Sequence, residues 1–415
     1  MIRAMSSALS GLRNHQLMLD VVGNDIANVS TAGFKSSVPL FSDLLTQTLN
    51  GAGAPTAGLG GTNPAQIGLG AGLAGTVQSF TQGSLQNTGR SSDLAIQGDG
   101  FFVIDNNGTQ TFTRAGAFNL DATGSLTTAD GGLVQGWQAD ATGAIDTNSP
   151  IGRVQIRVGD LLAPTQTSIA NLGGNLAADA APGAVTAMSI AAYDSQGTAV
   201  SIDLTFTKDL VVPNRWTVAA TTGAPPTAVA LTDNVLDFDG VGELVAPADR
   251  NINIAGGVIP GMPNAVTIDL GAASTPGRIT QYSGASTAGV VDQNGAAAGT
   301  LQSYSIGQDG VIVGNYSNGR AKSIGQVALA VFTNPGGLSR TGGGWQQTAN
   351  SGLAQIGVGG QGGRGSLSAG TLEMSNVDLA EEFTRLIVAQ RGFQGNARVI
   401  TTADEVLQEV VNLKH

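Results

Sequence analysis

The chain of 415 residues contains no cysteine, few aromatic residues and few charges. Without cysteine, neither a disulfide framework nor a thiolate metal site is possible. Aromatic residues make up only 5% of the chain and are scattered, which argues against a carbohydrate-binding face built from them. No segment reaches the roughly 18 apolar residues of a membrane span, and the N-terminus lacks the apolar segment of a signal peptide, so neither membrane insertion nor a cleaved signal peptide is expected.

Positive charge and catalytic residue types are also scarce. The 19 Lys and Arg against 30 Asp and Glu give a net charge of -11, which disfavours nucleic acid as a partner. The only histidines are His15 and His415, GxSxG is absent, and GGQGGRG at 359–365 is no Walker motif. The acidic turns at 105–109 and 237–240 lack the spaced ligands of a calcium loop. We therefore predict no enzyme, no cofactor and no metal site.

Each end of the chain carries apolar residues at heptad spacing, which is typical of long helices that pack against other helices. Near the N-terminus the pattern comprises Met5, Leu12, Leu19 and Ile26, with Leu9 on a neighbouring line. At the C-terminus it comprises Leu372, Leu379, Leu386, Phe393, Ile400 and Leu407. The second pattern predicts a helix of about 38 residues, roughly 57 Å long.

Residues at the helix ends fit this prediction. Gly33 suits the left-handed conformation that closes a helix, and Ser375 is expected to cap the C-terminal helix. Gly392 and Gly395 should each cost about 1 kcal/mol inside that helix, so we expect a close neighbour there, with a local kink as the alternative. The charges follow the helix dipole, with Asp378, Glu381 and Glu382 near the start and Lys414 and His415 at the end.

The middle of the chain has the period of two that half-buried strands show. Polar residues alternate with Ile202, Leu204 and Phe206, and again with Val266, Ile268 and Leu270. Residues 101–104 and 111–114 flank an Asn-Asn-Gly turn, and Asp-x-x-Gly recurs at 121–124, 140–143 and 194–197, which matches the preferences of tight turns. Short strands with frequent turns predict sandwich or barrel-like domains.

Glycine-rich stretches that begin near residues 50 and 357 separate the predicted helices from the β region. Such stretches are expected to be hinges or extended connectors. The sequence thus predicts a mainly β fold with α-helical termini, in which two long helices form a coiled-coil-like core and two β-sandwich or barrel-like domains are inserted between them. The expected divisions are a helical core (1–30 and 371–415), connectors (31–74 and 357–370), an inner β domain (75–160 and 297–356) and an outer β domain (161–296).

Neither terminal helix has enough sequence around it to bury its apolar seam within its own segment. We therefore predict that further identical copies cover the seams, and that each leucine buried this way contributes roughly 1.5–3 kcal/mol. An ordinary helical hairpin within one chain is the alternative. The predicted subunit interface comprises Met5, Leu9, Leu12, Leu19, Ile26, Leu379, Leu386, Phe393, Ile400 and Leu407.

Several long stretches have distinctive sequences. SGLRNHQLMLDVVGNDIANVSTAGFK (10–35) and SNVDLAEEFTRLIVAQRGFQGNARVITTADEVLQEVVNLK (375–414) resemble the N- and C-terminal signatures of the flagellar axial family of rod and hook proteins. SSDLAIQGDGFFVI (91–104) and the segment 111–137 resemble the β block of the hook and distal rod members. Residues 161–296 resemble the outer domain of hook-type members, whereas rod members are shorter.

This resemblance implies a structural subunit of the flagellar hook, a homopolymer of many copies that forms a curved, flexible tube and acts as a universal joint. It implies contacts with the rod on one side and hook–filament junction proteins on the other, and with a hook cap during assembly. Export would use the flagellar apparatus, and the protein would be extracellular. A distal rod protein of the same family and, in another class, a secreted β-rich adhesin with trimerising helices remain alternatives.

The resemblance also gives a role to Gly33, Phe34 and Lys35, where the chain would leave the core helix for the connector. Phe34 is hypothesised to anchor against neighbouring subunits, and an ordinary buried phenylalanine after a helix end is the alternative. Because a hook bends as it rotates, interfaces between β domains are expected to be polar and weak.

Overall fold

The computed structural model describes residues 2–55, 58–272 and 276–412, which belong to two compact units. The terminal unit comprises residues 1–157, 304–314 and 323–415, and the inserted unit comprises 158–303 and 315–322. Strands account for 41% of the chain and the long helices lie at its two ends. The predicted mainly β fold with helical termini is therefore confirmed. Lys414 and His415 lie outside the described residues.

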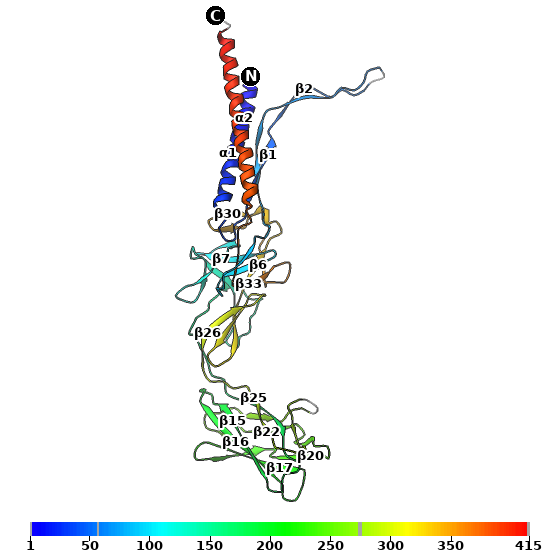
Figure 1. The fold of residues 1–415 in the computed structure, drawn as a ribbon, viewed down its shortest axis with the longest axis vertical. Helices are drawn as coiled ribbons and strands as arrows, with labels where there is room; N and C mark the ends of the chain where they lie inside the picture. Colours follow the sequence, from blue (N-terminus) through cyan, green and yellow to red (C-terminus); the bar gives the residue numbers. More distant parts are fainter. Residues whose placement is uncertain (1, 56–57, 273–275, 413–415) are drawn as a thin grey trace. The chain divides into compact units, whose positions relative to one another are not determined.

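The terminal helices are α1 (Ile2–Ala27) and α2 (Leu379–Asn412), and they pack side by side in the terminal unit. Figure 1 shows both chain ends at the same end of this helix pair, so the two helices run antiparallel. The cap of α2 differs from the prediction, because Asp378 rather than Ser375 accepts the backbone N–H groups of Ala380 and Glu381. Among the described residues, no helix has the length and apolar character needed to span a membrane.

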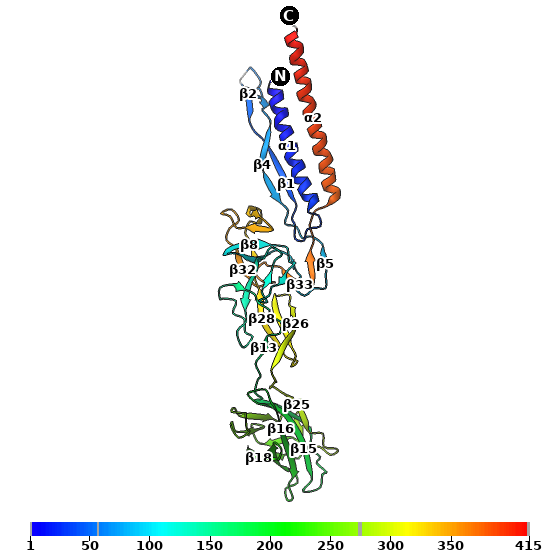
Figure 2. The same ribbon diagram turned by 90° about the vertical axis from the view of Figure 1, so that its left-hand side faces the viewer.

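A long antiparallel hairpin follows α1 and is called the exposed hairpin here, residues 37–78. Its strands β1 (Ser37–Asp43) and β4 (Ala71–Gln78) pair from one end to the other, with a bulge after Leu40, and β2 (Thr46–Asn50) pairs with β3 (Ala65–Gly68) further out. Figure 2 shows β1 and β4 beside α1, with which both strands are in contact. Much of the segment expected to be a connector is thus paired strand.

Two short strand pairs join the beginning and the end of the chain below the helices. Strand β5 (Leu85–Asn87) pairs with β34 (Thr371–Glu373), and β6 (Leu94–Gln97) pairs with β33 (Ser366–Ala369). These pairings bring the segment that leads into α2 beside the segment that follows the exposed hairpin. Both ends of the chain are therefore fixed to the same β structure.

The main sheet of the terminal unit has the strand order β28-β11-β7-β8-β31-β30. The predicted hairpin of β7 and β8 is present, closed by the turn between Asn106 and Thr109. An aromatic core of Phe101, Phe112, Phe332 and Trp345 packs against this sheet with mostly edge-to-face ring contacts. The strands of this sheet and those attached to it are β7 (Phe101–Asn106), β8 (Thr109–Thr113), β9 (Asn119–Leu120), β10 (Leu126–Thr127), β11 (Leu133–Gln138), β12 (Gly152–Arg153), β28 (Ala321–Val327), β29 (Leu329–Val331), β30 (Ser339–Thr341), β31 (Gly344–Gln346) and β32 (Gln355–Gly357), with a 3-10 turn at Pro335–Gly337.

Two six-stranded sheets form the inserted unit. The first contains β14 (Ile169–Asn175), β19 (Leu231–Thr232), β22 (Asn251–Ile254), β23 (Val266–Asp269), β24 (Ile279–Thr280) and β25 (Gly289–Gln293). The second contains β15 (Val185–Tyr193), β16 (Ala199–Lys208), β17 (Arg215–Thr222), β18 (Thr227–Val229), β20 (Val235–Phe238) and β21 (Leu244–Ala246). The remaining strands are β13 (Leu161–Leu162), β26 (Gly299–Ile306) and β27 (Val311–Tyr316).

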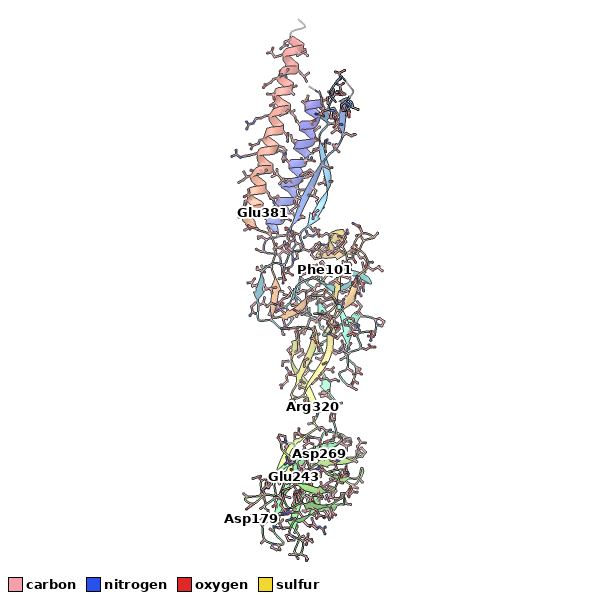
Figure 3. The ribbon with its side chains drawn as sticks, turned by 90° about the vertical axis from the view of Figure 1, so that its right-hand side faces the viewer. Phe101, Asp179, Glu243, Asp269, Arg320 and Glu381 are labelled. Carbon is pink, nitrogen blue, oxygen red and sulfur yellow. The ribbon has the colours of Figure 1, made fainter. Side chains whose placement is uncertain are left out.

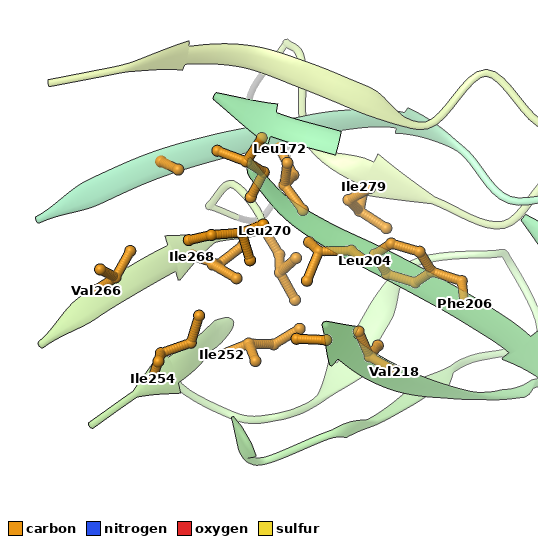
Figure 4. Close-up of a cluster of buried hydrophobic side chains, with 14 of the residues drawn as sticks. Leu172, Leu204, Phe206, Val218, Ile252, Ile254, Val266, Ile268, Leu270 and Ile279 are labelled. Atoms are coloured by element: carbon orange, nitrogen blue, oxygen red, sulfur yellow. The ribbon is translucent and has the colours of Figure 1, made fainter. Parts of the chain in front are cut away.

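One hydrophobic core lies between the two sheets of the inserted unit, as Figure 4 shows. The alternation predicted for residues 202–206 and 266–270 is confirmed, since all six of the named apolar side chains are buried there. The Asp-x-x-Gly turns are confirmed as well: the Oδ1 atoms of Asp121, Asp140 and Asp194 each accept backbone N–H groups two and four residues further on.

Candidate functional site

The contact between α1 and α2 depends on glycines. A Cβ atom on Gly11 would lie 2.7 Å from Asn396 Nδ2, and one on Gly392 would lie 2.4 Å from two atoms of the His15 ring. Moving four residues along α1, from Gly11 to His15, moves four residues back along α2, which defines the antiparallel register. The close neighbour expected for Gly392 is therefore His15. Gly395 and Gly23 instead face open space, because a Cβ atom at either position would have no described neighbour within 4 Å.

The tightest part of the helix contact is built from small and polar side chains rather than from the predicted apolar line. Ala8, Val22 and Ala389 are buried there. Eight of the ten predicted interface residues are only half-buried: Met5, Leu12, Leu19, Ile26, Leu386, Phe393, Ile400 and Leu407. The other two, Leu9 and Leu379, are exposed. In a single chain the apolar stripes are thus incompletely covered.

Further exposed apolar side chains on α2 were not predicted. They are those of Phe383, Ile387, Val388, Val399, Val406 and Val410, each between 43% and 56% exposed and distributed over more than one side of the helix. The helix register places the first residue of α1 opposite residue 405, so the last turns of α2 extend past α1, as Figure 1 also shows. These residues are visible in the sequence as further apolar positions of the helix, but they lie outside the heptad spacing on which the interface prediction was based.

The exposed hairpin carries a further set of uncovered apolar side chains. Those of Leu44, Leu45, Leu49 and Leu59 are 54–77% exposed. Several large apolar side chains exposed on one segment are typical of a surface that binds a partner. Together with α2, the exposed hairpin makes the helical end of the terminal unit an apolar surface suited to association.

Below the helices, three buried charged residues form what we call the junction cluster: Lys35, Arg114 and Glu373. The Lys35 ammonium lies 2.6 Å from Glu373 Oε1 and also donates to the carbonyl of Thr81. Arg114 lies 3.3 Å from Glu373 Oε2, and the Lys35 and Glu373 side chains are fully buried. Burial lowers the pKa of the Lys35 side chain, and its bond to Glu373 opposes that shift. The cluster ties together three segments that are far apart in sequence.

Gly33 and Phe34 complete this junction. The Gly33 N–H donates to the Glu373 carbonyl, and with φ at +70° an added Cβ would lie 2.4 Å from the Ala115 backbone nitrogen. Gly33 does not close α1 directly, because the helix ends earlier, at Ala27. Phe34 is buried within its own chain, beneath the Arg340 guanidinium 4.4 Å from its ring centre. This burial is consistent with the ordinary buried phenylalanine that the sequence also allowed, and an anchoring contact with neighbouring subunits stays a prediction.

No part of the described chain gathers three or more His, Cys, Asp or Glu side chains in a way that could hold a metal ion. His15 is one of two histidines in the chain, and its ring packs against Gly392. What the terminal unit does present is partly exposed apolar helix surface and the buried junction cluster.

Four protein-family models match the chain in order. They are described as flagella basal body rod protein (residues 5–35), flagellar hook protein FlgE/F/G D1 domain (95–174), flagellar basal body protein FlaE D2 domain (177–296) and flagellar basal body rod FlgEFG protein C-terminal (368–413). The crystal structure of Helicobacter pylori flagellar hook protein FlgE2 matches with a TM-score of 0.52 at 15% identity, over 70% of this chain and 100% of that one. This last match concerns the fold alone.

Relatives match over the whole chain. The flagellar hook protein FlgE of Borreliella burgdorferi is 39% identical over 100% of both chains, and that of Escherichia coli is 37% identical over 99% of this chain and all of its own. The flagellar basal-body rod protein FlgG of Bacillus subtilis is 31% identical over 100% of both chains. With this identity over its full length, the chain belongs to the flagellar hook protein family.

Proposed function

We propose that this chain is a structural subunit of the flagellar hook, which polymerises into a curved, flexible tube and acts as a universal joint that transmits torque from rod to filament. The observation that carries the proposal is the uncovered apolar surface of α2 and the exposed hairpin, in a protein whose β cores are otherwise well buried. Burial of that apolar surface by other copies of the chain would provide the driving force for polymerisation.

The tube's core is proposed to form from the helix pairs of many copies. The predicted interface residues, eight half-buried and two exposed, then pack against neighbouring helices, as do the other exposed apolar side chains of α2. Gly395 and Gly23 support this arrangement, because each costs about 1 kcal/mol within a helix and faces open space in the single chain. Close approach of a second copy's helix would explain both glycines.

The β domains are proposed to lie outside the core, with 75–160 and 297–356 as an inner domain and 161–296 as an outer one. Bending requires them to slide past their neighbours with little change in free energy. The outward face of β15, β16 and β17 is rich in Ala, Ser and Thr, and Ser189 and Ser201 exchange a hydrogen bond across it. Such a face supports contacts that water can replace.

The further partners are proposed from family membership. They are the rod at one side, hook–filament junction proteins at the other, a hook cap during growth and the flagellar export apparatus. The protein would act outside the cell as a structural component and not as an enzyme. The helical core domain proposed here comprises 1–30 and 371–415, joined through 31–74 and 357–370.

Electron microscopy of the concentrated or salted-out protein tests the proposal. Straight or curved tubes are expected, whereas discrete trimers would favour a secreted adhesin and contradict it. The distal rod alternative is kept because of the Bacillus subtilis rod relative. Deleting the gene separates these two, since loss of the rod tip points to a rod protein and loss of the hook alone points to a hook subunit.

Limited proteolysis gives a second test on dilute protein. If other copies complete the helical core, early cleavage should concentrate in residues 1–74 and 371–415 and leave a resistant β core. Assembly should then protect both ends. Equal protection of the whole chain before assembly would contradict the proposed role of the termini.

A further inference from the structure

Two carboxyl groups face each other inside the helix pair, at the end nearest the β structure. Asp25 on α1 is 0% exposed and Glu382 on α2 is 3% exposed. His15 of α1 lies opposite Gly392 of α2. In an antiparallel pair, the residue ten positions after His15 therefore lies opposite the residue ten positions before Gly392, and these residues are Asp25 and Glu382. Figure 3 labels the neighbouring Glu381, which marks this end of α2.

Each carboxyl group has one oxygen in a hydrogen bond and one without. Asp25 Oδ2 accepts the backbone N–H of Ser37 at 2.9 Å, and Glu382 Oε1 accepts from Arg385 at 3.1 Å. Asp25 Oδ1 and Glu382 Oε2 are buried and have no hydrogen-bond partner among the described residues. A buried acceptor left unpaired costs about 1–3 kcal/mol, and more when it is charged. Two such atoms from facing residues are best satisfied by each other.

Burial favours a bound proton on the pair, and the charges around it act in both directions. Arg385 of α2 and Arg340 of β30 oppose protonation, whereas Asp378 and Glu381 of α2 add negative charge beside Glu382 and favour it. Arg385 is shared, since it also binds Glu381. Asp25 lies in the last turn of α1, where the helix dipole disfavours negative charge. Burial raises the pKa of both carboxyl groups, and Asp25 raises that of Glu382 further.

We propose that Asp25 and Glu382 share one proton in an Oδ1–H···Oε2 hydrogen bond that locks α1 to α2 at the base of the helix pair. Through Asp25 Oδ2 the same bond holds Ser37, the first residue of β1, so it also sets where the exposed hairpin leaves the helices. The helix pair therefore closes with proton uptake and loosens when that proton is lost.

The direction of the pH effect follows from linkage. A carboxyl group whose pKa is raised in the folded state adds stability that is fully present below its ordinary value, here 3.8 for Asp25 and 4.5 for Glu382, and that is lost as the pH rises through the folded value. Closing the helix pair between these values and neutrality should accordingly take up as much as about one proton per chain.

Proton uptake on assembly of the full-length chain is the experiment, measured in unbuffered solution at a series of pH values above 4.5. The wild type should take up more protons per chain than Glu382→Gln or Asp25→Asn, because an amide supplies the hydrogen bond without a proton from solution. Glu409→Gln is the matched control, because it makes the same charge change on an exposed side chain near the other end of α2, and it should behave as the wild type does. Equal uptake by the wild type and both pair variants would overturn the proposal.

A second measurement needs no variant. The carboxyl carbons of the labelled wild-type polymer, followed by solid-state NMR, should include one protonated group per chain between pH 4.5 and neutrality. Two ionised groups at the pair would also overturn the proposal. This measurement uses the polymer and therefore rests on the proposed function. A wild type that never polymerises would count against that function. The same NMR titration on the dissolved chain would still test the carboxyl pair.

Discussion

The two regions of this chain differ in how completely they bury their apolar residues. In the inserted unit, side chains as large as Trp216 and Phe206 are fully buried between two sheets. In α2 of the terminal unit, Phe383 and Ile387 are each 51% exposed. The inserted unit therefore buries its apolar core within a single copy, whereas the helix pair of a single copy leaves much of its apolar surface uncovered.

Charge shows the opposite arrangement. The ion pairs of the inserted unit are partly exposed, as in Arg278 with Glu243. Directly below the helix pair, by contrast, the junction cluster buries three charges completely. Surface ion pairs contribute little to stability, whereas a buried cluster strongly penalises the loss of any member. The terminal unit thus combines a partly exposed apolar surface with a buried charged cluster beneath it. This combination suits a subunit that associates in one defined orientation.

The largest effect that would test this comparison is on assembly. Leu386→Asp or Ile400→Asp should reduce the yield of sedimentable polymer to background, because a carboxylate would have to be buried among helices. Leu386→Met, which nearly conserves volume, should still polymerise. The unfolding of the inserted unit, followed through Trp216, should not change in any of these variants. Normal polymer from the aspartate variants would remove these side chains from the proposed interface.

Next in size is the loss of the junction cluster. Glu373→Gln should lower the free energy of unfolding of the terminal unit by about 3–5 kcal/mol, because Lys35 and Arg114 would remain buried without their counter-charge. Denaturant unfolding of the soluble chain measures this effect. The matched variant Glu243→Gln, in the half-exposed pair of the inserted unit, should cost about 0–1 kcal/mol. Equal losses in the two variants would mean that the junction is no more rigid than a surface pair.

Much of the fold could be predicted from periodicity. The alternation at 202–206 and 266–270, the Asn-Asn-Gly hairpin and the Asp-x-x-Gly turns are local patterns, and the structure contains all of them. The paired strands of the exposed hairpin were missed because glycine-rich sequence indicates flexibility, and nothing local identifies β4 as the partner of β1. The predicted cap of α2 was one turn too early, because Ser375 and Asp378 are both good capping residues.

The candidate site was only partly predictable. Heptad spacing located the apolar stripes, but the tightest helix contact involves Ala8, Gly11 and Gly392, which no hydrophobic pattern reveals. Lys35 belonged to the predicted junction, but its burial was not predicted, because a lysine is normally exposed and its partner Glu373 is more than three hundred residues away. Only the pairing of β34 with β5 brings them together. The carboxyl pair Asp25–Glu382 likewise depends on the helix register.

A smaller effect is expected from the turn that enters the junction. Gly33→Ala should destabilise the terminal unit, because a left-handed alanine costs about 1–2 kcal/mol and the crowding against Ala115 adds about 1–3 kcal/mol. Gly363→Ala is the control, since its φ is +79° and no described atom lies within 4 Å of the added carbon. Thermal unfolding of the two variants separates strain from crowding. A smaller loss for Gly33→Ala than for Gly363→Ala would contradict the tight packing of the junction.

The smallest effect concerns acid sensitivity in the inserted unit. Hydrogen bonds from the turn backbone, chiefly that of Thr198, lower the pKa of Asp194 below 3.8, so its contribution to stability is present above that value and is lost as the pH falls through the lower folded value. Asp194→Asn should therefore make the unfolding temperature less dependent on pH in this acid range. Asp203→Asn removes a charge from the exposed face of β16 without these backbone bonds and serves as control. If the dependence of the unfolding temperature on acid pH were the same in Asp194→Asn as in the wild type, the turn would be held by its glycine and not by the carboxylate. Because the inserted unit buries its core without other copies, this pH dependence should be the same in monomer and polymer.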